Sequence, residues 1–206
     1  EDEIEVLKSR KLMRGVVDKL QLNKAFFARG RLIDTEYYPH DKSPIKVNFI
    51  ASDSILNKSK FSFSILITSE TTVTKKMFFG KNVPTAIGDI VITPNTKKIS
   101  NFIDQAIYIK VTPLDKVAEN YKNAILISTA GKGSKVINLS LDDGSVNKAK
   151  AVINNLIDEY NRVSIEAKSS KSNNTAEFIN KRIDLIATDL SKVDDDIESF
   201  KTGNKL

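Results

Sequence analysis

The sequence predicts an α+β protein: a mixed α/β head with a multi-stranded sheet over residues 1–142, followed by a long C-terminal helical arm, a coiled coil, over residues 143–206. Before residue 142, apolar residues alternate with polar ones in several short segments, which is the period of β-strands. After it, apolar residues recur at intervals of three and four, the heptad spacing of helices that pack along their length. The chain from 145 to 202 contains neither proline nor glycine, so nothing in the sequence interrupts a helix there.

The head should begin with an amphipathic helix. Leu12, Val16 and Leu20 recur at every fourth position, which places them on one helical face. Four of the first five residues are acidic, and carboxylates are favourable at the positive end of a helix dipole. Asn23 is the expected stop of this helix.

The rest of the head should consist of strands and one short helix. Residues 61–67 alternate phenylalanine or isoleucine with serine, so a hairpin is expected between this segment and residues 73–79. Thr112 as N-cap and Pro113 at the first helical position predict the start of the helix. The other strands are expected at residues 26–33, 45–51, 106–112, 125–128 and 136–141, with a turn at Gly131–Gly133 between the last two.

The arm carries two heptad seams. The first consists of Val146, Ala149, Ile153, Leu156, Tyr160, Val163 and Ala167, and the second of Ile179, Ile183, Ile186, Leu190, Val193, Ile197 and Phe200. We expect a single helix of about 55 residues, with the first seam packed on the head; two helices broken near Ser169–Asn174 are the alternative. In either case the second seam has to be buried against a partner, and we expect the chain to end before a returning helix that would supply one.

The charge is distributed unevenly along the chain. Lysine and arginine outnumber aspartate and glutamate by 22 to 14 over residues 1–141, whereas over residues 142–206 they are outnumbered by 12 to 10. A basic head is compatible with anionic lipid, anionic glycan or nucleic acid. The lysines are dispersed, however, and no aromatic residues are interleaved with them in a basic stripe, so we do not expect nucleic-acid binding.

The residue types that carry most chemistry are scarce. There is no cysteine and a single histidine, His40, which rules out disulfides and argues against histidine-rich metal sites. The run Ala130–Lys135 lacks the first glycine and the following helix of a phosphate-binding loop. Asp194–Asp196 are consecutive on a predicted helix and point in different directions, so they should not converge on a cation. We therefore expect no catalytic residue, cofactor or metal.

The residues alone leave two functions open. One is an enzyme that processes a glycan with the carboxylates of Asp34, Glu36 and Asp41. The other is a periplasmic adaptor with a helical hairpin that bridges an inner-membrane transporter and an outer-membrane duct. Adaptors of this kind have domains rich in glycine turns, and the chain has only 8 glycines. No stretch is long and apolar enough to span a membrane, and no signal peptide opens the chain.

Three groups of residues resemble the periplasmic region of the Wzz/Wzc polysaccharide co-polymerase family. The first is Glu3–Arg10 with Val16–Val17 and Leu20–Leu22; the second is Val136–Asp143 with Ala149, Asn155, Leu156 and Tyr160; the third is Phe178–Ile179, Leu190, Ile197–Lys201 and Asn204. The resemblance covers most of the chain, least clearly residues 34–105, and is greatest to the capsular and exopolysaccharide tyrosine-autokinase branch. The chain departs from the family at Gly144–Ser145, where many members have Asp-Pro. We expect it to be a periplasmic fragment without the two flanking membrane helices and any kinase module.

The resemblance implies a non-catalytic periplasmic domain anchored to the inner membrane in the complete protein, which can carry a cytoplasmic tyrosine autokinase. Such a domain regulates polysaccharide chain length by forming homo-oligomeric rings. Its partners would be a Wzy-type polymerase, the growing polysaccharide and an outer-membrane export channel. The residues expected to carry oligomerisation and arm packing are Ile4, Leu7, Arg10, Ile179, Ile183, Ile186, Leu190, Val193, Ile197 and Phe200.

Overall fold

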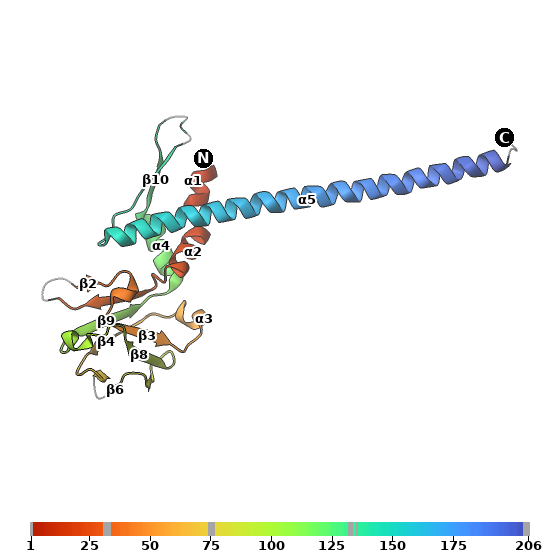
Figure 1. Cartoon of the computed structure of the whole chain (residues 1–206). Helices are drawn as coiled ribbons and strands as arrows, with labels where there is room; N and C mark the ends of the chain where they lie inside the picture. Colours follow the sequence, from red (N-terminus) through yellow and green to blue (C-terminus); the bar gives the residue numbers. More distant parts are fainter. Residues whose placement is uncertain (1, 31–33, 74–76, 132–133, 135, 204–206) are drawn as a thin grey trace. The chain divides into compact units, whose positions relative to one another are not determined.

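The computed structural model describes residues 2–30, 34–73, 77–131, 134 and 136–203 (Figure 1). The side chains of residues 2, 77, 194–196, 198 and 200–203 lie outside this description. The contacts divide the chain into two compact units, residues 1–160 and 161–206. Helices and antiparallel sheets both occur, as the predicted α+β class requires.

The first unit begins with two short helices, α1 (Asp2–Leu7) and α2 (Arg10–Lys19). The expected single helix is interrupted at Ser9, whose backbone is extended and whose hydroxyl caps α2 by accepting a hydrogen bond from the Leu12 amide at 3.3 Å. The apolar face of α2 is buried and packs against α4 (Leu114–Ala124). Arg14 and Asp115 form an ion pair across this contact at 3.5 Å.

The main sheet has four antiparallel strands in the order β2 (Thr35–Glu36), β1 (Lys24–Ala28), β9 (Ala106–Val111) and β4 (Phe61–Leu66). Ile109 of β9 lies between Phe26 of β1 and Phe63 of β4 in the register. Ile107, Ile109 and Val111 are completely buried, so the central strand β9 is also the centre of the hydrophobic core.

A second antiparallel sheet, in the order β3 (Ile45–Phe49), β8 (Ile90–Pro94) and β7 (Asn82–Val83), shares this core. Its buried residues Ile45, Ile90 and Ile92 belong to the same cluster as Phe26 and Ile107. Shorter elements connect the two sheets: the 3-10 helices η1 (His40–Lys42) and η2 (Ile99–Phe102), the helix α3 (Asp53–Leu56) and the strand pair β5 (Thr72–Val73) and β6 (Met77–Phe78).

The hairpin expected between residues 61–67 and 73–79 is reduced, among the described residues, to one antiparallel bridge, because β5 pairs with β6 instead of continuing along β4. Residues 74–76 lie outside the described residues. The alternating pattern identified β4 as a strand, but it could not indicate that its partner lies some 40 residues later in the chain. The expected helix start is also displaced by one residue, because Pro113 is the N-cap and Leu114 is the first helical residue.

The strands expected before and after Gly131–Gly133 pair with each other. β10 (Leu126–Thr129) pairs antiparallel with β11 (Ile137–Ser140), with Ile127 opposite Leu139. Lys132 and Gly133 lie outside the described residues. The element that follows this segment among the described residues is the strand β11.

A single helix, α5 (Val146–Gly203), follows β11 and extends from the first unit into the second. The alternative of two helices broken near Ser169–Asn174 is therefore wrong. Val152 and Leu156 are completely buried in the first unit, which explains why that unit extends to Tyr160. Helix α5 also comes close to α2, because a Cβ atom added to Gly15 would lie 2.9 Å from Oε1 of Glu159.

Candidate functional site

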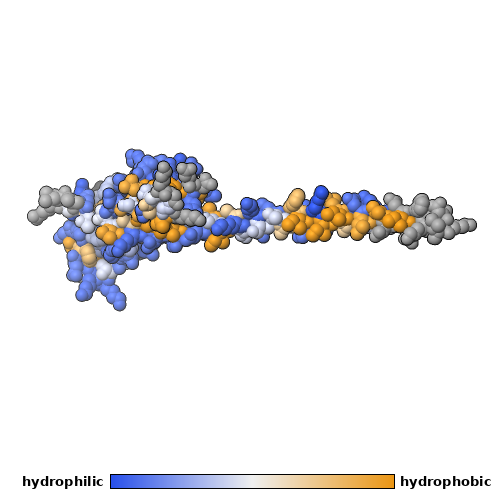
Figure 2. All heavy atoms as spheres, turned by 90° about the horizontal axis from the view of Figure 1, so that it is seen from above, coloured by the Kyte–Doolittle hydropathy of each residue, from blue (hydrophilic) through white to orange (hydrophobic). Residues whose placement is uncertain are grey.

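The most conspicuous surface of the second unit is the apolar edge of α5, defined here as Ile179, Ile183, Ile186, Leu190, Val193 and Ile197. Each of these side chains is between 47 and 60% exposed. Figure 2 shows the corresponding concentration of hydrophobic atoms along the helix. Their spacing of four and three residues repeats as in the a and d positions of a heptad, so they form one continuous stripe. The side chain of Phe200, the last expected member, lies outside the described residues.

Helix α5 has only modest local support in the second unit. Glu177 and Lys181 form an exposed pair at 2.7 Å across one helical turn, and such a pair contributes about 0.3–0.5 kcal/mol. The polar stretch Lys168–Thr175 is fully exposed and rich in serine and asparagine, which are weaker helix formers than alanine. A helix with an exposed heptad stripe gains most of its stability when the stripe is buried against a partner.

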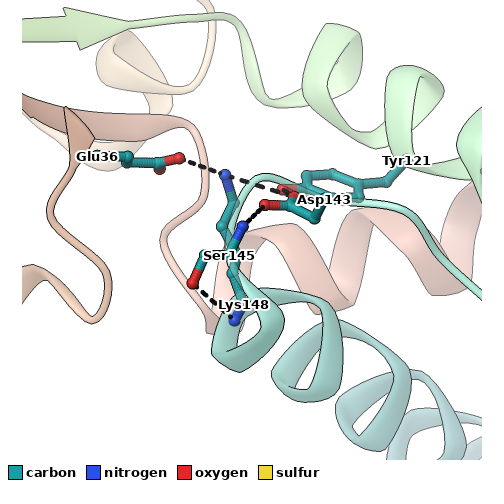
Figure 3. A network of polar contacts seen from close by, with 5 residues as sticks. All are labelled: Glu36, Tyr121, Asp143, Ser145 and Lys148. Carbon is teal, nitrogen blue, oxygen red and sulfur yellow. Dashed lines mark hydrogen bonds and ion pairs between the residues drawn. The ribbon is translucent and has the colours of Figure 1, made fainter. Parts of the chain in front are cut away.

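The beginning of α5 is held in the first unit by a network of polar contacts around Lys148 (Figure 3). Lys148 Nζ lies 2.7 Å from Oε2 of Glu36 and 3.7 Å from Oδ2 of Asp143. The Tyr121 hydroxyl donates a hydrogen bond to the same Asp143 oxygen at 3.1 Å. The three charged side chains are only 12–22% exposed, so these contacts are less screened by water than ordinary surface ion pairs.

Asp143 also organises the chain that leads into α5. Its Oδ1 accepts a hydrogen bond from the Ser145 amide at 3.0 Å, and the Ser145 hydroxyl accepts one from the Lys148 amide at 3.4 Å. These contacts satisfy amides that have no carbonyl partner at a helix start. Ser145 thus provides the capping hydroxyl at the start of α5.

The network alters the titration of its members. Burial raises the pKa of Tyr121 to about 12, and the neighbouring Asp143 carboxylate adds to the increase. Burial opposes the charge of Lys148, but its hydrogen bond to Glu36 and the adjacent Tyr121 outweigh that effect and raise its pKa above the ordinary lysine value. Lys148 is therefore charged and Tyr121 neutral throughout the physiological pH range.

The residues expected at the N-terminus occupy different environments in the first unit. Leu7 is 5% exposed and therefore belongs to the interior. Ile4 is half-buried, and Arg10 is exposed with its Nε atom 3.9 Å from Glu119. Of the expected oligomerisation residues, those on the apolar edge are the ones with large exposed apolar side chains.

The three carboxylates of the glycan-processing alternative also differ in their contacts. Glu36 is paired with Lys148, and Asp34 accepts a hydrogen bond from the Gly30 amide at 3.2 Å. Asp41 lines a separate pocket together with His40. Glu36 thus has a clear structural role in the Lys148 network.

Sequence reasoning did not find the Lys148 network. Glu36, Tyr121 and Lys148 are distant in the chain, and a single sequence carries no direct record of their proximity. One signal was present: Lys148 precedes Val152 and Leu156 at intervals of four, so it lies on the helical face that is buried. A lysine in that position requires an acidic partner or access to water.

Within the described part of the chain, no helix is long and apolar enough to cross a membrane. No group of three histidine, aspartate or glutamate side chains among the described residues is placed to hold a metal ion. Neither protein-family models nor curated protein sequences match the chain.

Proposed function

We propose that the chain is the periplasmic domain of a polysaccharide co-polymerase, and that it regulates polymer length by self-association rather than by catalysis. In this proposal the first unit lies near the inner membrane, and the apolar edge of α5 forms a coiled coil in a homo-oligomer. The partners would be a Wzy-type polymerase, its polysaccharide and an outer-membrane export channel. A cytoplasmic tyrosine autokinase would belong to other parts of the complete protein.

The single observation that supports the proposal most strongly is the exposed apolar edge. Isolated apolar residues are common on protein surfaces, but these six large aliphatic side chains form one continuous apolar stripe. Their heptad spacing suits another helix as the covering surface. The α+β first unit followed by a long helix is also the architecture that the resemblance implies.

The proposal predicts that a charge on the apolar edge prevents self-association. Leu190→Asp should convert concentration-dependent oligomers of the 206-residue chain into monomers, because a carboxylate at the centre of the seam would have to be buried without a partner. Ser191→Asp is the matched control, since it adds the same charge at the adjacent exposed position outside the seam. Sedimentation velocity over a range of concentrations measures both.

The same pair of substitutions tests the function in cells. Introduced into the complete gene, Leu190→Asp should change the distribution of polysaccharide lengths on a gel, and Ser191→Asp should leave it as in the wild type. Equal sedimentation of the wild type and Leu190→Asp, together with identical polymer lengths, would contradict the proposal.

A further inference from the structure

The main sheet of the first unit ends at β4, and the second sheet ends at β7. Among the described residues, no strand pairs with the second side of β4 over residues 61–65. A groove of about 320 Å³ lies there, between β4 and residues 83–86 at the end of β7 and the loop after it. The proposed self-association through the apolar edge of α5 makes no use of this groove.

The register of β4 shows which backbone groups face the free side. Ile67 lies opposite Gln105 and donates a backbone hydrogen bond to its carbonyl at 3.3 Å. In an antiparallel pair, residues bonded to the residue opposite alternate with residues whose amide and carbonyl point away. The odd-numbered residues of β4 therefore bond to β9, whereas Ser62 and Ser64 direct their amides and carbonyls to the free side.

These outward groups are available for pairing. None of the described residues forms a hydrogen bond with them, and a row of unpaired amides and carbonyls is a template for another strand. Proteins usually protect such an edge with a charge, a proline or a bulge. Residues 61–69 contain neither a charge nor a proline, and the register with β9 is continuous from Phe61 to Leu66. The edge is thus open to an added strand.

The groove beside this edge is apolar. Ile65, Ile90 and Ile92 form the buried part of its lining, and Phe63 and Val83 are half-buried. Among the described residues of the lining, none is charged. A charged side chain would lose its water there without gaining an opposite charge. Since the side chains of a strand alternate between two faces, an added strand should carry aliphatic or aromatic residues at every second position.

We infer that the groove binds an extended, uncharged segment of another polypeptide, which adds a strand to β4 and places its apolar side chains over Phe63 and Ile65. In this mode of recognition the main-chain hydrogen bonds provide affinity, and the apolar contacts provide specificity. Residues 83–86 line the side of the groove across from β4, so the occupant has chain on both sides. A single extended segment fits there, whereas β4 of a second copy would bring the rest of its own sheet against residues 83–86.

Selection of random dodecapeptides displayed on phage against the immobilised 206-residue chain tests the inference. We expect enriched sequences in which apolar residues alternate with polar ones, which is the period of a strand. Sequences with apolar residues at every third and fourth position would instead suit a helix on the apolar edge of α5. An enriched alternating peptide is then synthesised, and its titration should shift the amide NMR signals of β4.

N-methylation of this peptide tests the main-chain pairing without changing the protein. Peptide residues opposite Ser62 and Ser64 lie on the same exposed face as these serines. They are therefore the polar residues, and their amides point at β4. Two N-methyl groups at polar positions should weaken binding about tenfold or more, because they remove two hydrogen bonds. Two N-methyl groups at apolar positions are the matched control and should cause a smaller loss, because those amides point away from β4.

Ser64→Pro removes the outward amide from the protein. The bonds to β9 are made by Phe63 and Ile65, and proline is tolerated where the amide of an edge strand faces solvent, so the sheet should persist. Binding of the unmethylated peptide should fall about tenfold or more. Ser64→Ala is the matched control, since it removes the same hydroxyl but keeps the amide, and it should bind as the wild type does. Circular dichroism checks folding, and the N-methyl comparison decides the question if Ser64→Pro does not fold.

A selection that enriches no alternating sequence, equal losses from the two sets of N-methyl groups, or unchanged binding by folded Ser64→Pro would each overturn the inference. A Leu190→Asp chain that stays dimeric until Ser64→Pro is added would also overturn it, because a second copy would then occupy the groove. The proposed function is tested separately: Leu190→Asp should still bind the peptide as a monomer. Loss of peptide binding in a chain whose oligomers still respond to Leu190→Asp refutes the groove assignment alone.

Discussion

At the scale of single residues, the Lys148 network explains how a polar cluster can be compatible with the interior. A partly buried charge is stable only when opposite charges and hydrogen bonds replace its water. Lys148 has two carboxylates within 3.7 Å, and the second of them, Asp143, also accepts hydrogen bonds from Tyr121 and from the Ser145 amide. The network thus joins β2, α4 and the first turn of α5.

Lys148→Met should lower the free energy of unfolding by about 2 kcal/mol, because it leaves Glu36 and Asp143 without their shared cation. The methionine keeps most of the apolar stem, so the loss reports the charge rather than the packing. In a double-mutant cycle with Glu36→Gln, the coupling energy should be about 1 kcal/mol or more.

Urea unfolding at neutral pH measures these energies. Lys150→Met is the matched control, since Lys150 is exposed two residues further along α5, and its effect should stay within about 0.5 kcal/mol. Equal effects of Lys148→Met and Lys150→Met would show that the network contributes nothing to stability.

At the scale of elements, the periodic patterns predicted the positions of individual helices and strands, which depend mainly on local sequence. The strands around β3, β4 and β9, the helix α4 and the length of α5 followed from alternation, heptads and the absence of proline and glycine. The partner of β4 did not follow, because pairing with β9 is a property of the whole fold. The break at Ser9 was missed because the apolar spacing continues across it while the serine hydroxyl offers α2 a separate cap.

The candidate functional surfaces also differ in whether the sequence could predict them. The apolar edge of α5 could be read from the sequence, since a heptad stripe depends only on spacing along one helix. The Lys148 network could not, because it combines side chains from several distant elements (Figure 3).

The polar stretch Lys168–Thr175 should be the least stable part of α5 in the second unit. Replacing Ser170, Asn173 and Asn174 by alanine should stabilise the local helix by about 0.5 kcal/mol for each residue. Together these changes should slow amide hydrogen exchange in that stretch about tenfold, as measured by mass spectrometry.

Ser191→Ala serves as the control for the exchange experiment, because it makes a similar substitution at another exposed position of α5. It should leave exchange in residues 168–175 unchanged. If the triple alanine variant exchanged as fast as the wild type, helix propensity would not be what limits stability there.

At the scale of the whole molecule, the division of the chain after Tyr160 has a packing explanation. The first turns of α5 bury Val152 and Leu156 completely and place Lys148 beside Glu36. The start of the long helix is therefore a structural part of the first unit. The sequence pattern changes at residue 142, but the first turns of α5 after it still pack in the core of the first unit.

A chain ending at Tyr160 should unfold cooperatively with a stability close to that of the first unit in the complete chain. A chain ending at Ser145 should be destabilised by at least about 4 kcal/mol, because it loses two fully buried aliphatic side chains and the Lys148 network. Thermal unfolding followed by circular dichroism compares the two chains. Equal melting temperatures would place the boundary near residue 142 after all.

Gly15 of α2 lies close to the carboxylate of Glu159 in α5. Glycine within α2 weakens that helix by about 1 kcal/mol relative to alanine, yet it leaves room for the Glu159 carboxylate. A larger residue at position 15 would have to displace the flexible Glu159 side chain from its place against α2. Position 15 thus offers a way to change the contact between α2 and α5 within the first unit without changing any residue of the apolar edge.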